Sequence, residues 1–370
     1  MTDLVTDDSP PLDFSGKAKL RRWWSRNKPR RSVAGLTALL ALVAGYLHFV
    51  LLPSYDVATE IKERRSIRAE VGHLLDRSDY AALEAMAESF RSEKSRTESG
   101  IWKLTVYYSG ISAKARLRGK SDPAWGDLSA KLKAWQEQYP DSPTPVIANA
   151  IAMRKYAQAL KPIVVFQRAS TAAPSEDEVF VSALRADQAY LERYAAVASK
   201  DPHFYVVWSN LAFALGADPA LFFDVVEEGM RSHPDYYQLY FAAMDFHAPS
   251  LRGDATAVEA FANMAAERTR SSEGLGLYTR VYWYAKAAYF GDDLFRRSEV
   301  NWPKMSAGID DILARYPDQW NINNFARLAC LAGDSGKTRA LLDRIEGTPI
   351  PQVWKSSSAL RGCRRLAKVE

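Results

Sequence analysis

Cysteine and histidine are scarce in this chain of 370 residues, which contains two cysteines and five histidines. No two histidines lie three or four residues apart, and there is no Cys-x-x-Cys pair. Because helical and turn-based metal sites place their ligands at those spacings, the sequence predicts no metal centre. It also lacks a glycine-rich phosphate loop, a dinucleotide fingerprint and a Gly-x-Ser-x-Gly elbow, so we expect no cofactor.

A broad positive surface is also missing, although the formal net charge is +5. Residues 1–32 contain eight lysines and arginines against four aspartates, which is a charge of +4. The other 338 residues therefore carry only 5 − 4 = +1. Proteins that bind nucleic acid need a concentrated basic footprint, so the charge pattern argues against a nucleic-acid partner.

One long apolar run stands out. Residues 33–52 form a stretch of 20 residues without a formal charge, which ends at Pro53. As a helix it would span about 30 Å, the thickness of the hydrocarbon core of a bilayer. Trp23, Trp24 and Tyr46 suit the membrane interface. We therefore predict a single transmembrane helix that contacts membrane lipid through residues 33–52.

A cleaved signal peptide is the alternative for this segment. Val43-Ala44-Gly45 would serve as the cleavage site, but the apolar run continues for seven residues beyond it and is longer than a typical signal core. The cations before the span favour a cytoplasmic N-terminus. Residues 1–32 are then a basic, partly disordered cytoplasmic tail, and residues 53–370 lie outside the cytoplasm.

The rest of the chain has helix punctuation and very little strand pattern. The best strand candidate, Ile163–Phe166, has four residues. Helix starts are indicated by a capping residue before proline, or by a capping box, at Asp122-Pro123, Asp218-Pro219 and Ser175–Glu178. The last of these predicts a helix that runs to about Ser199. The fold class expected is all-α.

A proline corner recurs between these helices, at Tyr139–Asp141, Asp201–His203, His233–Asp235 and Tyr316–Asp318. Gly-Asp turns follow at Gly253, Gly291 and Gly333. Pro202 and Pro234 are 32 residues apart, close to the period of tetratricopeptide hairpins. We predict a helical stalk or a first helix of the body over residues 53–78, an imperfect tetratricopeptide-like α-solenoid over 79–360 with an insertion at 161–174, and a basic C-terminal tail over 361–370.

Several short sequence words occur in a recognisable order: Leu83-Glu84, Ser99–Leu104, Tyr107–Gly110, His233–Tyr237, Glu273-Gly274, Tyr278–Tyr282, Tyr316–Asn321 and Phe325–Cys330. Over most of residues 70–355 the chain resembles a bacterial family known only as a domain of unknown function. The resemblance implies a helical-repeat protein that is membrane-associated or exported, with no assigned activity. The body would then be periplasmic, on an inner-membrane anchor. Leu251–Asp254 departs from the Trp-Gly-Gly-Asp-like turn of that family, which puts any site built on that tryptophan in doubt.

The architecture suggests binding rather than catalysis. A helical solenoid exposes a concave face, and polar or aromatic side chains on that face can hold a protein or peptide partner. The candidates follow the proline corners: Asn149, Asn210, Tyr240, Tyr282, Asn321 and Asn324. Asparagine amides pair with an extended backbone, and tyrosine adds flat area with a polar tip. For each residue the alternative is a helix cap or a solvated position.

Two other functions remain open. An exported carbohydrate-active α/α enzyme would need two carboxylates across an aromatic cleft, with parts supplied by Tyr278, Tyr282, Trp283, Asp235, Asp292 or Asp318. The anchor and stalk would instead oligomerise if the protein were an assembly component.

Cys330 and Cys363 lie 33 residues apart and form a disulfide if the body is outside the cytoplasm. Otherwise Cys330 is a small buried residue and Cys363 is free.

Overall fold

The computed structural model describes residues 59–117, 119, 121–160, 174–216, 219–247 and 254–369. Within these residues the chain is helical, as predicted, and the one strand-like feature is an isolated bridge between Arg96 and Trp102. In the same residues no helix has the length and apolar character needed to cross a bilayer. The predicted span 33–52, the tail before it and the strand candidate at 163–166 lie outside the described residues.

The described part of the chain consists mainly of helices. In chain order they are α3 (Thr59–Asp76), α4 (Tyr80–Ser92), α5 (Lys103–Lys114), α6 (Ala124–Gln138), α7 (Pro143–Leu160), α8 (Pro174–Ala198), α9 (His203–Leu215), α10 (Pro219–Ser232), α11 (Tyr237–His247), α12 (Ala255–Glu273), α13 (Gly276–Ala285), the π-helical η2 (Lys286–Phe290), the 3₁₀ turn η3 (Gly291–Asp293), α14 (Leu294–Arg297), α15 (Trp302–Arg315), α16 (Gln319–Leu331), α17 (Ser335–Leu342), α18 (Pro351–Trp354) and α19 (Ser357–Ala367).

Local sequence signals account for many of these boundaries. All four proline corners fall between helices, before α7, α9, α11 and α16. The Asp254 carboxylate accepts a hydrogen bond from the backbone N–H of Ala257 at 2.8 Å, and Asp334 caps α17 in the same way through Lys337. Such caps satisfy N–H groups that have no partner within the helix. The helix predicted to end near Ser199 is α8, which ends at Ala198.

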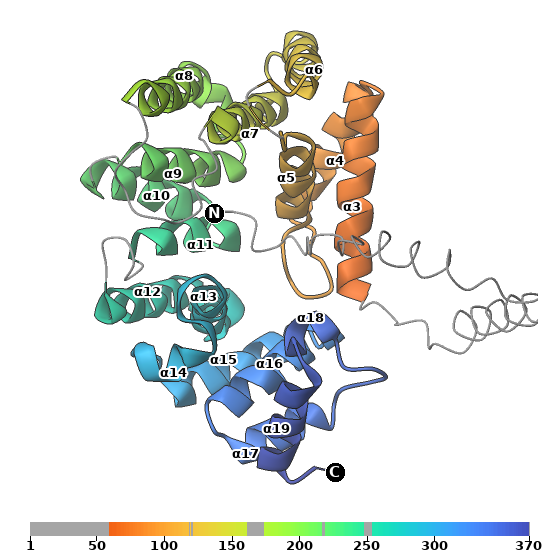
Figure 1. Ribbon diagram of the computed structural model, residues 1–370, viewed down its shortest axis with the longest axis vertical. Coiled ribbons are helices and arrows are strands. Elements are labelled where there is room, and N and C mark those ends of the chain that lie inside the picture. Colours follow the sequence, from red (N-terminus) through yellow and green to blue (C-terminus); the bar gives the residue numbers. More distant parts are fainter. Residues whose placement is uncertain are drawn as a thin grey trace, which may run out of the picture.

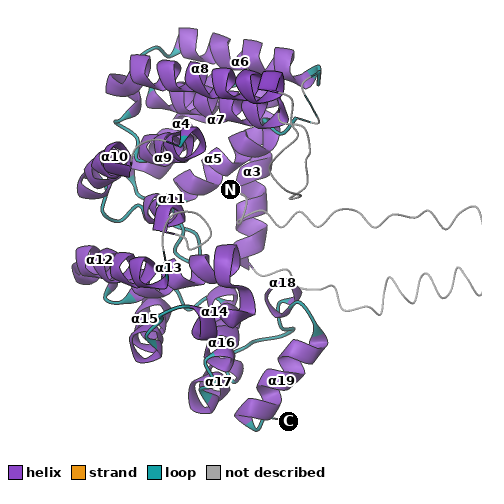
Figure 2. Cartoon of the chain, turned by 60° about the vertical axis from the view of Figure 1, so that its left-hand side comes forward, coloured by secondary structure: helices purple, strands orange, loops and turns teal. Residues whose placement is uncertain are grey.

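The helices from α7 to α17 stack along the long axis of the molecule (Figures 1 and 2). Neighbours in sequence pack together, including α7 with α8, α12 with α13, and α16 with α17. Helix α3 runs beside this stack, approximately along its length, and packs on α5 (Figure 1). Its first turn reaches α16, so the beginning of the described chain meets its C-terminal part.

A largely buried polar cluster holds the N-terminal helices to the middle of the stack. The Asp201 carboxylate, before α9, accepts hydrogen bonds from Arg91 Nε at 2.9 Å and from the Tyr108 hydroxyl at 2.7 Å. The His203 ring stacks on Tyr108 with centroids 4.4 Å apart, and its Nδ1 lies 2.8 Å from the Tyr236 hydroxyl. Burial lowers the pKa of His203 to about 3, so this imidazole is neutral and structural.

The segment expected to be a stalk is part of the helical body. Helix α3 begins at Thr59 and buries Ile61, Val71, Leu74 and Leu75. These side chains lie on one helical face, which packs onto α5 instead of standing free. Removal of such side chains from water is the main stabilising term in folding, so α3 belongs with the domain that follows it.

The predicted C-terminal tail at 361–370 is also corrected. Helix α19 continues through Ala367 and buries Cys363 and Ala367. The basic composition of this segment suggested a tail. Leu360, Cys363 and Ala367 are nevertheless spaced by three and four residues, so they lie on one side of the helix. The basic residues Arg361, Arg364, Arg365 and Lys368 are exposed.

A disulfide ties α19 to the stack. The structure joins Cys330 in α16 to Cys363 in α19, with Cα atoms 5.5 Å apart and a sequence separation of 33. Closing a loop of this length removes conformational freedom from the unfolded chain. We expect Cys330→Ala/Cys363→Ala to lower the free energy of unfolding by about 3 kcal/mol in urea titrations. Adding reductant should produce the same loss in the wild type and none in the variant; equal stability of all four samples would contradict the bridge.

Candidate functional site

A cavity of about 530 Å³ opens where the beginning of α3 meets the C-terminal part of the chain. This volume lies within the range of small-molecule and side-chain binding sites, about 300–1,000 Å³. The described walls come from α3, the loop before α5, the start of α16 and the segment after α17: Thr59, Lys62, Glu98, Pro317, Asp318, Gln319, Glu346, Gly347, Thr348 and Ile350. The cavity is the candidate functional site.

Carboxylates dominate the charge of this cavity. Glu98, Asp318 and Glu346 face one described cation, Lys62. The side chains of Glu98 and Glu346 are exposed, and within the described chain neither forms an ion pair. The walls therefore carry more negative than positive charge.

Asp318 is half-buried, unlike the two exposed glutamates. Its carboxylate caps α16 by accepting hydrogen bonds from the backbone N–H groups of Trp320 at 2.9 Å and Asn321 at 3.1 Å. Burial, and to a smaller extent the Glu60 charge, raise its pKa to about 6 although these two hydrogen bonds act in the opposite direction. The carboxylate is thus mostly charged at pH 7, and it takes up a proton as the pH falls toward 6.

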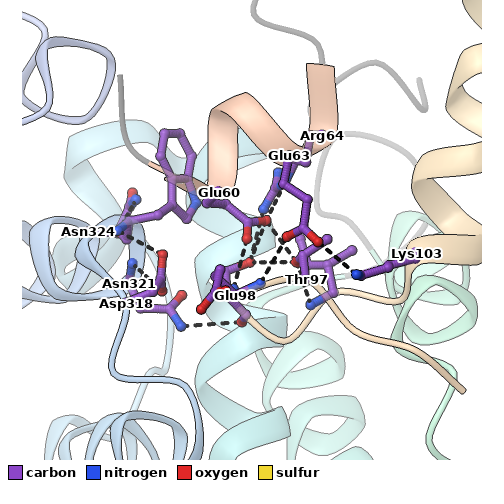
Figure 3. A network of polar contacts seen from close by, with 12 residues as sticks. Glu60, Glu63, Arg64, Thr97, Glu98, Lys103, Asp318, Asn321 and Asn324 are labelled. Carbon is purple, nitrogen blue, oxygen red and sulfur yellow. Dashed lines mark hydrogen bonds and ion pairs between the residues drawn. The ribbon is translucent and has the colours of Figure 1, made fainter. Parts of the chain in front are cut away.

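Behind the cavity, Glu60 anchors the loop that precedes α5 (Figure 3). Its fully buried carboxylate accepts hydrogen bonds from the Thr97 hydroxyl at 2.9 Å, and from the Ser99 backbone N–H at 2.8 Å and hydroxyl at 2.7 Å. Arg64, one turn further along α3, forms an ion pair with the same carboxylate. Buried charges are stable when they are paired and hydrogen-bonded in this way.

The same loop also contacts helices from the other half of the chain. The Ser99 carbonyl accepts hydrogen bonds from the Arg280 guanidinium in α13 at 2.8 Å and from Asn321 Nδ2 in α16 at 3.2 Å. Gly100 has φ +87°, and a Cβ at this position would lie 2.7 Å from Arg280 and Tyr316. Glycine is therefore required for the loop to fit between these helices. The loop fixes the cavity wall that carries Glu98.

Of the predicted groove residues, Tyr240 and Tyr282 are corrected by the structure. Both side chains are fully buried. The Tyr282 hydroxyl donates to Glu259 at 2.6 Å, and the Tyr240 hydroxyl has no hydrogen-bond partner within the described chain. Their rings fill the space between packed helices, as aromatic side chains at helical spacing commonly do. Neither side chain is therefore accessible to a partner protein.

Three of the predicted asparagines bind the chain itself. Asn149 is half-buried, and its Nδ2 donates to the Pro145 carbonyl at 3.0 Å. Asn321 is fully buried against the Ser99 carbonyl, and Asn324 Nδ2 donates to the Trp320 carbonyl at 2.9 Å. Asn321 is therefore not accessible to a partner, whereas Asn149 and Asn324 are half-buried and their role in a groove stays a prediction.

Asn210 differs from the other predicted asparagines. It is half-buried, and its Nδ2 has no hydrogen-bond partner within the described chain. It lies on α9, which packs on α8, where both oxygens of the buried Asp187 carboxylate also lack partners. The structure does not bring Asn210 to the walls of the cavity.

The aspartates proposed for an enzyme have separate partners. Asp235 forms ion pairs with Lys94 and Arg96, at 3.4 and 3.6 Å. Asp292 accepts from Arg327 at 2.7 Å, and only Asp318 lines the cavity. No set of histidine, cysteine, aspartate and glutamate side chains suited to a metal ion occurs in the described part of the chain.

Sequence reasoning missed Glu98 and Glu346. Each is a single exposed charge in a connection between helices, which usually means no more than a solvated loop. Glu346 and Gly347 precede Thr348-Pro349, a local signal for a turn. That signal predicts the connection but not its position opposite α3.

Comparison with protein-family models, curated proteins and solved structures finds no match for this chain. The resemblance to the bacterial family of unknown function therefore stays a prediction based on the sequence words given above.

Proposed function

We propose that the protein is a membrane-anchored helical-repeat binding module whose cavity beside Thr59 receives a protein or peptide partner outside the cytoplasm. The observation that carries this proposal is the cavity, with its exposed and unpaired carboxylates Glu98 and Glu346. Concave sites in which polar groups converge are common places for a ligand or partner to bind.

The repeat architecture supports a cavity site over the open groove first expected. Stacked helical pairs of a solenoid would present an inner face, but α3 and the loop containing Ser99 pack across α13 and α16. The part of that face which Asn321 occupies is thus filled by the chain itself. The cavity beside α3 lies next to this filled part and is open to a partner.

The predicted anchor would hold this cavity close to the membrane. Six residues lie between Leu52 and Thr59, and a fully extended chain from one to the other reaches about 25 Å at most. Cys330 and Cys363 form a disulfide, and such bridges persist in oxidising compartments outside the cytoplasm. The disulfide supports the proposed topology, with residues 53–370 on the extracytoplasmic side.

The carbohydrate-active alternative receives less support from the cavity. None of its described lining residues is aromatic, whereas a sugar-binding cleft would use aromatic faces. Of the aspartates proposed for that enzyme, Asp318 alone lines the cavity, and Asp235 and Asp292 are paired elsewhere. We therefore favour binding without turnover.

Site-specific photo-cross-linking in intact membranes tests the proposed function. A photoreactive benzoylphenylalanine replacing exposed Thr348, within the cavity, should give a discrete cross-linked species in the full-length chain. The same residue replacing Glu137, exposed on α6, is the control. We expect no discrete species from position 137. Identical patterns from the two positions, or none from 348, would contradict a partner at the cavity.

A further inference from the structure

The charges of the cavity indicate what kind of group it receives. We infer that it binds a cation on an aliphatic stem, namely the guanidinium or ammonium of an arginine or lysine side chain of the partner. This inference rests on the proposed function, in which the cavity is the docking site. It adds the chemical class of the group that docks.

Glu98 and Glu346 are the first part of the evidence. They come from segments almost 250 residues apart in the sequence, and the fold brings both to one cavity. Neither carboxylate has an ion pair within the described chain. By contrast, the neighbouring Glu63 is already paired with Lys103 at 2.8 Å. The two exposed carboxylates are therefore available to a cation from outside.

Asp318 adds negative charge at the inner side of the cavity. Backbone N–H groups hold its carboxylate in place, and no described lysine or arginine side chain forms an ion pair with it. Glu60, behind it, is already matched by Arg64. An arriving cation therefore meets a fixed acceptor whose charge is not neutralised by contact, and charge-assisted hydrogen bonds are stronger than neutral ones.

The apolar walls favour a stem over a bare inorganic ion. Pro317 and Ile350 line the same cavity as the carboxylates. Lysine and arginine bury their methylene groups along such surfaces while their charged ends stay with polar partners. The volume of about 530 Å³ also exceeds what a single metal ion requires.

Fluorescence anisotropy with defined peptides tests this inference on the full-length chain in nanodiscs. The probe is fluorescein-labelled Gly-Ser-Arg-Gly-Arg-Ser, and its neutral counterpart has glutamine in place of both arginines. We expect saturable binding of the arginine peptide, at least about tenfold weaker binding of the glutamine peptide, and a similar weakening in the Glu98→Gln/Glu346→Gln variant.

A second pair of substitutions controls for net charge. Glu137→Gln/Glu267→Gln changes the charge by the same amount at exposed positions on α6 and α12, where the side chains are 67% and 70% exposed. This variant should bind the arginine peptide within about twofold of wild type. Equal weakening in both variants would overturn the inference, because the attraction would then be non-specific.

Further arms separate this inference from the proposed function. If the glutamine peptide bound as tightly as the arginine peptide, the cavity would still be a peptide site, but the inference that it recognises a cation would be wrong. Agmatine that competes with the arginine peptide would support the cationic class. Binding of agmatine without binding of either peptide would support the class and contradict the peptide partner. No binding of any probe would overturn the inference, while the cross-link from position 348 would still test the docking site.

Discussion

Replacing Glu60 with alanine should lower the free energy of unfolding by about 3 to 5 kcal/mol, the range for breaking a buried ion pair by removing one partner. The substitution leaves the Arg64 guanidinium buried without its carboxylate. It also removes the acceptor of the Thr97 hydroxyl and of the Ser99 N–H. Urea titration followed by circular dichroism measures the loss.

Glu63→Ala is the matched control on the same helix. Glu63 is partly exposed and pairs with Lys103 at 2.8 Å, and removal of such a pair costs about 1 kcal/mol or less. Similar losses for Glu60→Ala and Glu63→Ala would show that the loop containing Ser99 is not held by a buried charge. The account of how the cavity wall is positioned would then be wrong.

Asp187→Asn should stabilise the protein relative to wild type at pH 8 but much less at pH 4. Asp187 lies on α8, and burial raises its pKa to about 7, although the Arg154 charge opposes this effect. The unfolded chain ionises this group near its ordinary pKa of about 4. The wild type therefore loses stability as the pH rises from about 4 to about 7, and the loss is constant above that range.

The size of this effect follows from the distance between the two pKa values. At about 1.36 kcal/mol per pH unit, the difference in free energy of unfolding between Asp187→Asn and wild type should grow by up to about 4 kcal/mol between pH 4 and pH 8. Glu192→Gln, exposed on the same helix, should show no such growth. A pH-independent difference for Asp187→Asn would contradict a buried carboxyl at this position.

Local chemistry made much of the fold predictable. Proline corners and aspartate caps act within a few residues of their own position, so Pro202, Pro234 and Pro317 correctly marked boundaries between helices. The all-helical class follows from the same signals. The span at 33–52 remains a prediction, since it lies outside the described residues.

Which side of each helix is covered depends on contacts with residues distant in sequence, and local sequence patterns do not predict such contacts. Asn321 looked like a groove residue, yet its amide meets a carbonyl 222 residues earlier in the chain. The Tyr282 hydroxyl in α13 similarly donates a hydrogen bond to Glu259 in the neighbouring helix α12. The spacing of residues along one helix does not indicate which residues of another helix they contact.

The cavity illustrates the same limit. Its walls combine the first turn of α3, Glu98, the start of α16 and the segment containing Glu346. Each segment alone reads as a helix start or a solvated turn. Only the packing of α3 against α16 turns these separate charges into one site.

Competition for the cross-link formed from position 348 tests the central claim most directly. The arginine peptide should suppress the cross-linked species in intact membranes, with half-suppression near the dissociation constant measured by anisotropy, while the glutamine peptide should leave it unchanged. A cross-link that persists undiminished when the arginine peptide saturates the cavity would show that the partner docks elsewhere.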